Sequence, residues 1–143
     1  MRDCRGNIVI SLIPVIEAKL PGYPVRTKIN KSNTGDSVTY PYVYISDIFQ
    51  TEEGSKSFPI YVVDLLIQVV HDDLTDLSSL WADQNAIAEI IQNKRDLILS
   101  NNFKLMSIEL GQISETEIET DTGIMNIGLI RMLLKVEDKI VNN

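Results

Sequence analysis

The residues best suited to chemistry in this sequence are three carboxylates and one imidazole: Asp64, His71, Asp72 and Asp73. Carboxylate oxygens and an imidazole nitrogen can together hold a divalent cation, as a metal-dependent hydrolase would require. Asp64 and His71 are an odd number of positions apart in a segment with strand character, so their side chains are expected on opposite faces. Asp72 and Asp73 instead fit the start of a following helix, near the positive end of its dipole.

Other signatures of catalysis are missing from the sequence. It has no Gly-x-Ser-x-Gly turn, no Walker or dinucleotide-binding glycine pattern, and no Glu-x-Lys after a plausible second strand. One histidine and one cysteine leave no set of zinc ligands and no intramolecular disulfide. We therefore expect no catalytic residue, no metal and no cofactor, and keep a metal-dependent hydrolase around Asp64, His71 and Asp72 only as the competing class.

Charge argues against tight binding to nucleic acid. The 143 residues include 20 acidic and 13 basic side chains, for a formal net charge of -7, and no cluster of Lys or Arg stands out. Tyr40, Tyr42 and Tyr44 could stack on bases, but without interleaved Arg they fit better as surface aromatics of a strand. A negative surface does leave one role near DNA open, because it lets a duplex pass without adhering.

Hydrophobic periodicity predicts the elements that must position these residues. Apolar side chains at helical spacing indicate an amphipathic helix over Val9–Leu20, kinked at Pro14 or starting there, and a main helix over Thr75–Leu99. Alternating or continuous apolar runs predict five strands, at Val25–Ile29, Tyr40–Phe49, Phe58–His71, Phe103–Ile113 and Ile124–Val136. The expected fold class is α+β, with a largely antiparallel sheet of about five strands packed with two helices in a single domain over residues 1–143.

Polar segments between these elements are predicted to be irregular. They are a short N-terminal tail over residues 1–6, a mobile loop over 30–39, a hairpin loop over 50–57 and an acidic hairpin loop from Glu115 to Asp121. Cys4 in the tail, between Arg2 and Arg5, could be a reactive thiol, although a disordered terminus explains it equally well. The apolar run from Ile8 to Ile16 is too short to cross a bilayer, so no membrane association is expected.

The third predicted strand is apolar on both faces. Its odd-numbered side chains, from Tyr61 to Val69, should pack on the core. The opposite face combines Asp64 and Gln68 with four apolar side chains, Ile60, Val62, Leu66 and Val70. Because the last strand also has two apolar faces, both sides of the sheet are expected to be covered. Either the two helices cover one side each, or a neighbouring subunit covers the side opposite the helices.

The order of elements resembles that of the tail-terminator, or tail-completion, family of bacteriophages. The resemblance rests on Tyr40-Pro41-Tyr42-Val43 opening a strand, the apolar strand Tyr61 to Val70, the helix Trp81 to Leu99, and the closing hairpin that ends in Leu129 to Val136. It covers nearly the whole chain and is a match of pattern, not of signature residues. Members of this family are small α+β proteins that close into rings.

The resemblance implies a structural role in a virion. It implies a hexameric ring, or a dodecamer in a head-to-tail connector, that caps the tail tube, joins adjacent tail and neck or portal proteins, and lets DNA pass without specific binding. Such a protein would be assembled in the host cytoplasm and reside in the virion. Ile60, Val62, Leu66 and Val70 would then form the subunit interface, and Glu52, Glu53 and Lys56 a channel or ring-to-ring loop. The alternative is a monomeric or dimeric adaptor that binds a protein partner through the same sheet face.

Overall fold

The computed structural model describes residues 1–27, 40–54, 59–72, 76–92, 97–121 and 123–140. Along the chain these residues form α1 (Arg5–Lys19), β1 (Val25–Thr27), β2 (Tyr42–Gly54), β3 (Pro59–Asp72), α2 (Ser78–Gln92), β4 (Phe103–Thr120) and β5 (Gly123–Asp138). The predicted loop over 30–39 lies outside the described residues. Neither described helix is long and apolar enough to cross a membrane.

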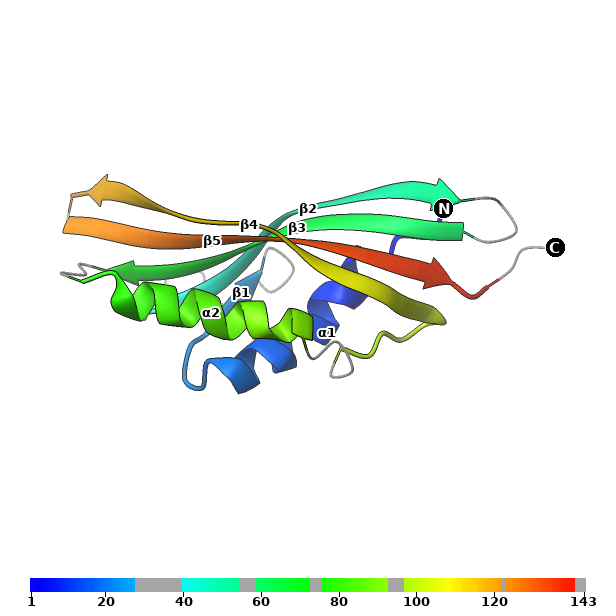
Figure 1. The fold of residues 1–143 in the computed structure, drawn as a ribbon, viewed down its shortest axis with the longest axis horizontal. Helices are drawn as coiled ribbons and strands as arrows, with labels where there is room; N and C mark the ends of the chain where they lie inside the picture. The colour runs from blue at the N-terminus through cyan, green and yellow to red at the C-terminus, as the bar shows by residue number, and fades with distance from the viewer. Residues whose placement is uncertain (28–39, 55–58, 73–75, 93–96, 122, 141–143) are drawn as a thin grey trace.

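The five strands form one twisted sheet in the order β1-β2-β3-β5-β4 (Figure 1). β1 runs parallel to β2, and every other pairing is antiparallel. The predicted α+β class with a largely antiparallel sheet is therefore confirmed. β3 is the central strand and β5 is an interior strand beside it, which is consistent with their apolar sequences.

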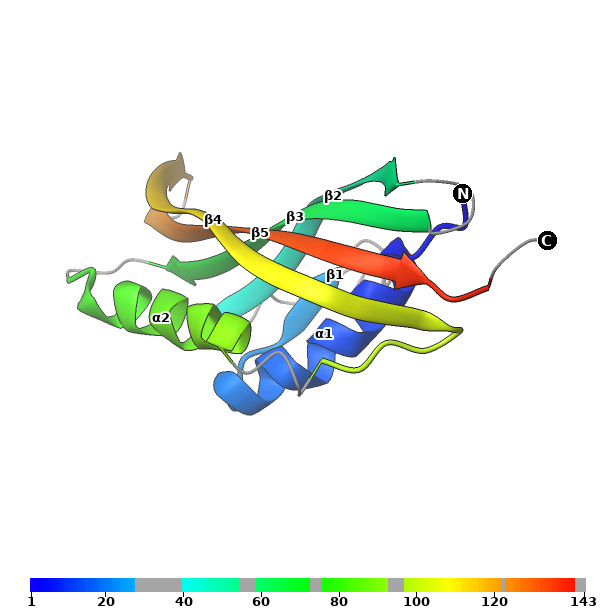
Figure 2. The same cartoon turned by 45° about the vertical axis from the view of Figure 1, so that its right-hand side comes forward.

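Both helices pack on the same face of the sheet, as Figures 1 and 2 show from two directions. The core joins α1 and α2 to the odd-numbered side chains of β3; its fully buried members include Ile8, Leu12, Ile16, Leu80, Ile87, Val63, Leu65 and Ile67. A sheet sandwiched between the two helices is therefore wrong. No helix or strand of the described chain covers the opposite face, which we call the open face.

Two of the predicted loops are wrong because the strands continue through them. β2 extends to Gly54, and residues 50–54 pair with Val63 to Pro59, so the hairpin loop does not begin at residue 50. β4 extends to Thr120, and its acidic segment, from Glu115 to Thr120, pairs with Gly128 to Gly123 of β5. In that segment Thr and Ile alternate with Glu, and β-branched residues with period 2 favour a strand even where charge suggests a loop.

The N-terminal tail is a second correction. α1 starts at Arg5, and Cys4 before it is fully buried. Pro14 neither starts nor ends the helix; it lies inside α1 on its exposed side.

The predicted main helix is longer than the observed one. α2 ends at Gln92, and Leu97 is already outside it.

Candidate assembly surface

The open face is a broad, mainly apolar surface. Side chains on it are identified by register, because residues that pair across antiparallel strands point to the same side. Its centre combines the even-numbered positions of β3 with the odd-numbered positions of β5. Its apolar members include Tyr42, Tyr44, Phe49, Ile60, Val62, Leu66, Val70, Ile127, Leu129 and Leu133. Phe49 at its border is 62% exposed.

Two ion pairs neutralise charge on the open face. Arg131 Nη1 lies 2.7 Å from Asp64 Oδ1, and Lys135 Nζ lies 3.5 Å from Glu53 Oε2. All four side chains are between a third and just over half exposed, so each pair contributes little to stability. Their effect is to leave the middle of this face without net charge, which suits a surface that another protein covers.

The four residues predicted at the subunit interface lie together on the open face but differ in exposure. Ile60, Val62 and Leu66 are half-buried, whereas Val70 is only 2% exposed. Val70 is flanked in register by Tyr42 and Ile127, so its side chain forms the floor of the surface. Leu66 is therefore a better residue than Val70 to substitute in a test of the interface, because its side chain is more exposed.

The predicted channel residues do not form one group. Glu52 and Glu53 are neighbours in β2, so their side chains point to opposite faces of the sheet. Glu53 is on the open face beside Lys135, and Glu52 pairs with Tyr61 on the helix side. Lys56 lies outside the described residues.

One corner of the open face is aromatic and cationic. The rings of Tyr40 and Tyr42 are 5.5 Å apart, and Tyr40 Oη lies 3.4 Å from Met125 Sδ. The guanidinium carbon of Arg26, on β1, lies 5.2 Å from the centre of the Tyr42 ring. Sequence reasoning found these tyrosines but missed Arg26. The parallel pairing of β1 with β2 places Arg26 beside these tyrosines, and no local sequence pattern predicts that pairing.

The opposite edge of the sheet, at the same end, is acidic. Glu115, Glu117 and Glu119 of β4 pair with Gly128, Asn126 and Ile124 of β5, so all three carboxylates point to the helix side. Each is exposed, and none forms an ion pair within the described chain. We call these three residues the acidic tip. A hollow of about 410 Å³ beside it is lined by Trp81, Gln84, Asn85, Ile113 and Glu115.

The predicted metal ligands are not brought together. Asp64 pairs with Arg131 on the open face, whereas His71 is buried on the helix side, as the spacing predicted. Asp73 lies outside the described residues, and within them no group of three or more His, Cys, Asp or Glu side chains could hold a metal.

His71 belongs to a buried hydrogen-bonded group instead. Its Nε2 lies 2.6 Å from Asp83 Oδ2 on α2, and Tyr23 Oη donates to the same oxygen at 2.9 Å. Burial and this carboxylate raise the pKa of Tyr23 to about 12. His71 and Asp83 are only 7% and 9% exposed, so the group ties α2 and the α1–β1 connection to the end of β3 and offers little access to a substrate.

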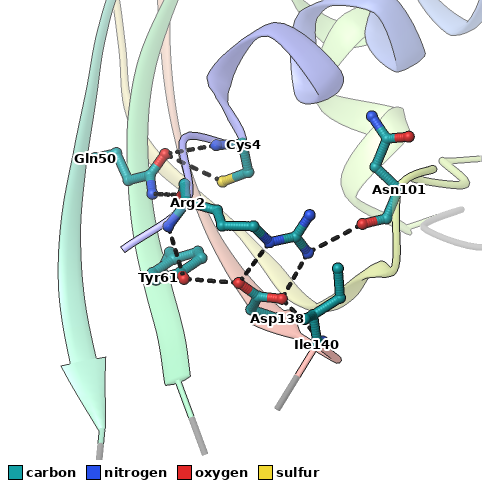
Figure 3. Close-up of polar contacts among 7 residues, drawn as sticks. All are labelled: Arg2, Cys4, Gln50, Tyr61, Asn101, Asp138 and Ile140. Carbon is teal, nitrogen blue, oxygen red and sulfur yellow. Dashed lines mark hydrogen bonds and ion pairs between the residues drawn. The ribbon is translucent and has the colours of Figure 1, made fainter. Parts of the chain in front are cut away.

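A second polar network closes the other end of the molecule (Figure 3). Arg2 donates through Nε and Nη2 to the two carboxylate oxygens of Asp138, at 2.9 and 2.6 Å, and Tyr61 Oη donates to the same carboxylate at 2.8 Å. The Cys4 thiol donates to Gln50 Oε1 at 3.2 Å. Burial raises the pKa of Cys4 to about 11, so it is not a reactive thiol.

Comparison with known proteins finds this fold in a virus-like particle. No protein-family model matches the chain, and no curated protein matches it. A solved structure described as the virion of a native gene transfer agent (GTA) particle contains a chain with the same fold, at a TM-score of 0.67. The match covers 92% of each chain at 17% sequence identity. At this identity it establishes a shared fold.

Proposed function

We propose that this chain is a structural, non-enzymatic virion protein that forms a ring at the junction between a phage tail and its head. The observation that carries the proposal is the fold match over 92% of both chains to a component of a gene transfer agent virion. Within that setting, the element order fits a tail terminator or a neck component. The tail and neck or portal proteins on either side of the ring would be its partners.

The open face supports an assembly role independently of the comparison. It joins half-buried aliphatic and aromatic side chains from three adjacent strands, with its central charges already paired. A surface of this kind favours contact with protein over contact with water. In a ring each subunit meets two neighbours through a head-to-tail contact, and a stable contact of that type buries on the order of 1,600 Å² in total.

The charge of the chain suits a ring through which DNA passes. With a net charge of -7, a channel lined by this protein would repel phosphates and hold a duplex without adhesion. Glu52, near the end of β2, is exposed and without an ion pair in the described chain, which suits a channel or ring-to-ring position better than the paired Glu53.

The experiment that tests this proposal is the native mass of the purified chain, measured over a range of concentrations at low and high salt. We expect a closed species of six or twelve subunits, and electron microscopy of that species should show a central opening. A chain that stays monomeric or dimeric at every concentration would contradict the ring. The open face would then fit an adaptor that binds a different protein.

A further inference from the structure

We propose that the acidic tip of one subunit binds Arg26 on the opposite sheet edge of the next subunit, closing the ring by a carboxylate–guanidinium contact. This inference rests on the proposed function, since it requires a ring of identical copies. It adds to that function the residues that join one copy to the next.

Arg26 is a cation that its own subunit leaves incompletely bound. Its Nε is buried and has no hydrogen-bond partner in the described chain, and none of the ion pairs there includes it. The ring of Tyr42 holds the guanidinium on one side. The buried Nε is enclosed by its own subunit, so a group on another copy would approach the remainder of this half-buried side chain. A planar, charged guanidinium is suited to a carboxylate, so the expected partner is an acid.

The acidic tip lacks a cation, just as Arg26 lacks an anion, within the described chain. Alternation along β4 puts Glu115, Glu117 and Glu119 on one face, where like charges repel one another. No basic side chain occurs from residue 105 to residue 130. A cation supplied by another molecule would relieve this repulsion. Ile124, 38% exposed on the same face, would add apolar contact beside it.

The register of the sheet places the two groups at matching height. One row of paired residues crosses all five strands, from Arg26 through Tyr44, Gln68 and Leu129 to Ser114. Arg26 begins this row on the β1 edge of the sheet, and Ser114 ends it on the β4 edge. Glu115 is the residue that follows Ser114 along β4. A rotation about an axis roughly along the strands therefore brings the β4 edge of one copy to the β1 edge of the next at the same level.

The directions of the side chains also agree. The acidic tip points to the helix side of its sheet, and Arg26 points to the open face with Tyr44. The two can meet where the hairpin end of one copy overlaps the open face of its neighbour. Such a contact joins two different surfaces, as a ring requires. On the open face it would lie next to Val70 and the rings of Tyr40 and Tyr42.

Charge-reversal substitutions in the purified 143-residue chain test this contact. We expect Arg26→Glu alone, and Glu115→Lys with Glu117→Lys, each to raise the concentration for half-assembly by about thirtyfold or more at low salt. Combining all three substitutions should restore assembly to within about threefold of wild type. Arg26→Gln, which removes the positive charge and keeps a polar side chain, should weaken assembly without adding a negative charge. Lys139→Glu, beyond the end of β5, and Glu17→Arg, at an exposed position of α1, are the matched controls and should leave assembly unchanged.

Each outcome decides a different point. If the wild-type chain forms no ring, the proposed function fails and this inference fails with it. If the wild type forms rings and Arg26→Glu forms them equally well, only the pairing fails. Loss of assembly in both charge reversals without recovery in the combined variant also overturns the pairing. Far-ultraviolet circular dichroism of each variant excludes unfolding as the cause.

Discussion

Asp138 is the residue through which the start and the end of the described chain are joined. Its side chain is 4% exposed and accepts hydrogen bonds from Arg2, Tyr61 and the backbone N–H of Ile140. The hydrogen bond from the Arg2 guanidinium is the main reason that the pKa of this carboxyl falls to about 2, against its usual 3.8. A buried charge satisfied on every side in this way stabilises the fold only while it is ionised.

We expect Asp138→Asn to lower the free energy of unfolding by about 2 kcal/mol at pH 7, because the charge-assisted contacts with Arg2 are lost. The pKa of this group is lower in the folded state than in the unfolded state. Its contribution is therefore complete above about pH 4 and disappears as the pH falls towards 2. Urea unfolding of both proteins between pH 7 and pH 2 measures the difference.

The control for Asp138 is Asp3→Asn. Asp3 forms an ion pair with Arg5, but both side chains are about half exposed, so this change should alter the free energy of unfolding by less than about 1 kcal/mol. A destabilisation by Asp138→Asn that is as large at pH 2 as at pH 7 would show that the lost contribution is not electrostatic.

At the scale of elements, β3 is the part of the fold that sequence predicts best. Apolar residues at every second position make its buried face readable without the rest of the chain. The acidic half of β4 was missed because Glu dominates its composition, although Thr116, Ile118 and Thr120 carry the alternation of a strand. The pairing of Arg2 with Asp138 could not be predicted, because the two residues are 136 positions apart along the chain.

The contact between α2 and the acidic hairpin depends on a glycine. The Gln84 side chain is 2% exposed, and its Nε2 donates to Ser114 O at 2.7 Å. A Cβ at Gly128 would lie 2.8 Å from Gln84 Cδ. We expect Gly128→Ala to lower the free energy of unfolding by about 1 to 3 kcal/mol, measured by thermal and urea unfolding, because the amide must move off its carbonyl partner.

Gly6→Ala is the matched control for that change. Gly6 lies in α1, and a Cβ there would meet no heavy atom within 4 Å. Alanine has the higher helix propensity, so this variant should be more stable than wild type by about 0.5 to 1 kcal/mol. If Gly128→Ala behaved in the same way, the close approach of Gln84 would not constrain the hairpin.

At the scale of the whole molecule, the placement of both helices on one side decides how the protein can associate. The helix side is closed by the core, so the sheet keeps its open face for another molecule. The apolar residues on both faces of β3 and β5 predicted that both sides of the sheet are covered. They could not predict which side the helices leave free, because amphipathic helices of this length fit either face.

We expect Leu66→Asp to leave the fold intact and abolish assembly. Leu66 is half-buried on the open face, so a carboxylate there remains solvated in the monomer but is buried without a partner in the ring. Sedimentation velocity at matched concentrations would show the loss of the large species. An unchanged oligomer would exclude this face as the contact.

Two controls frame the Leu66 result. Ile10→Asp replaces an apolar side chain that is 66% exposed on α1, so it should assemble normally. Leu65→Asp changes the adjacent residue, which is fully buried on the helix side, and should abolish folding. Together they separate a surface effect from a general effect of adding charge.

The strand order has a consequence for the speed of folding. β2–β3 and β4–β5 are hairpins of neighbours in sequence, but the sheet is complete only when β3 docks on β5, across a separation such as the 77 positions between Tyr61 and Asp138. Pairings this distant slow folding to the millisecond-to-second range. Until they form, the two most apolar strands expose unpaired edges to other chains. Cooler, slower expression is therefore expected to raise the yield of soluble subunit.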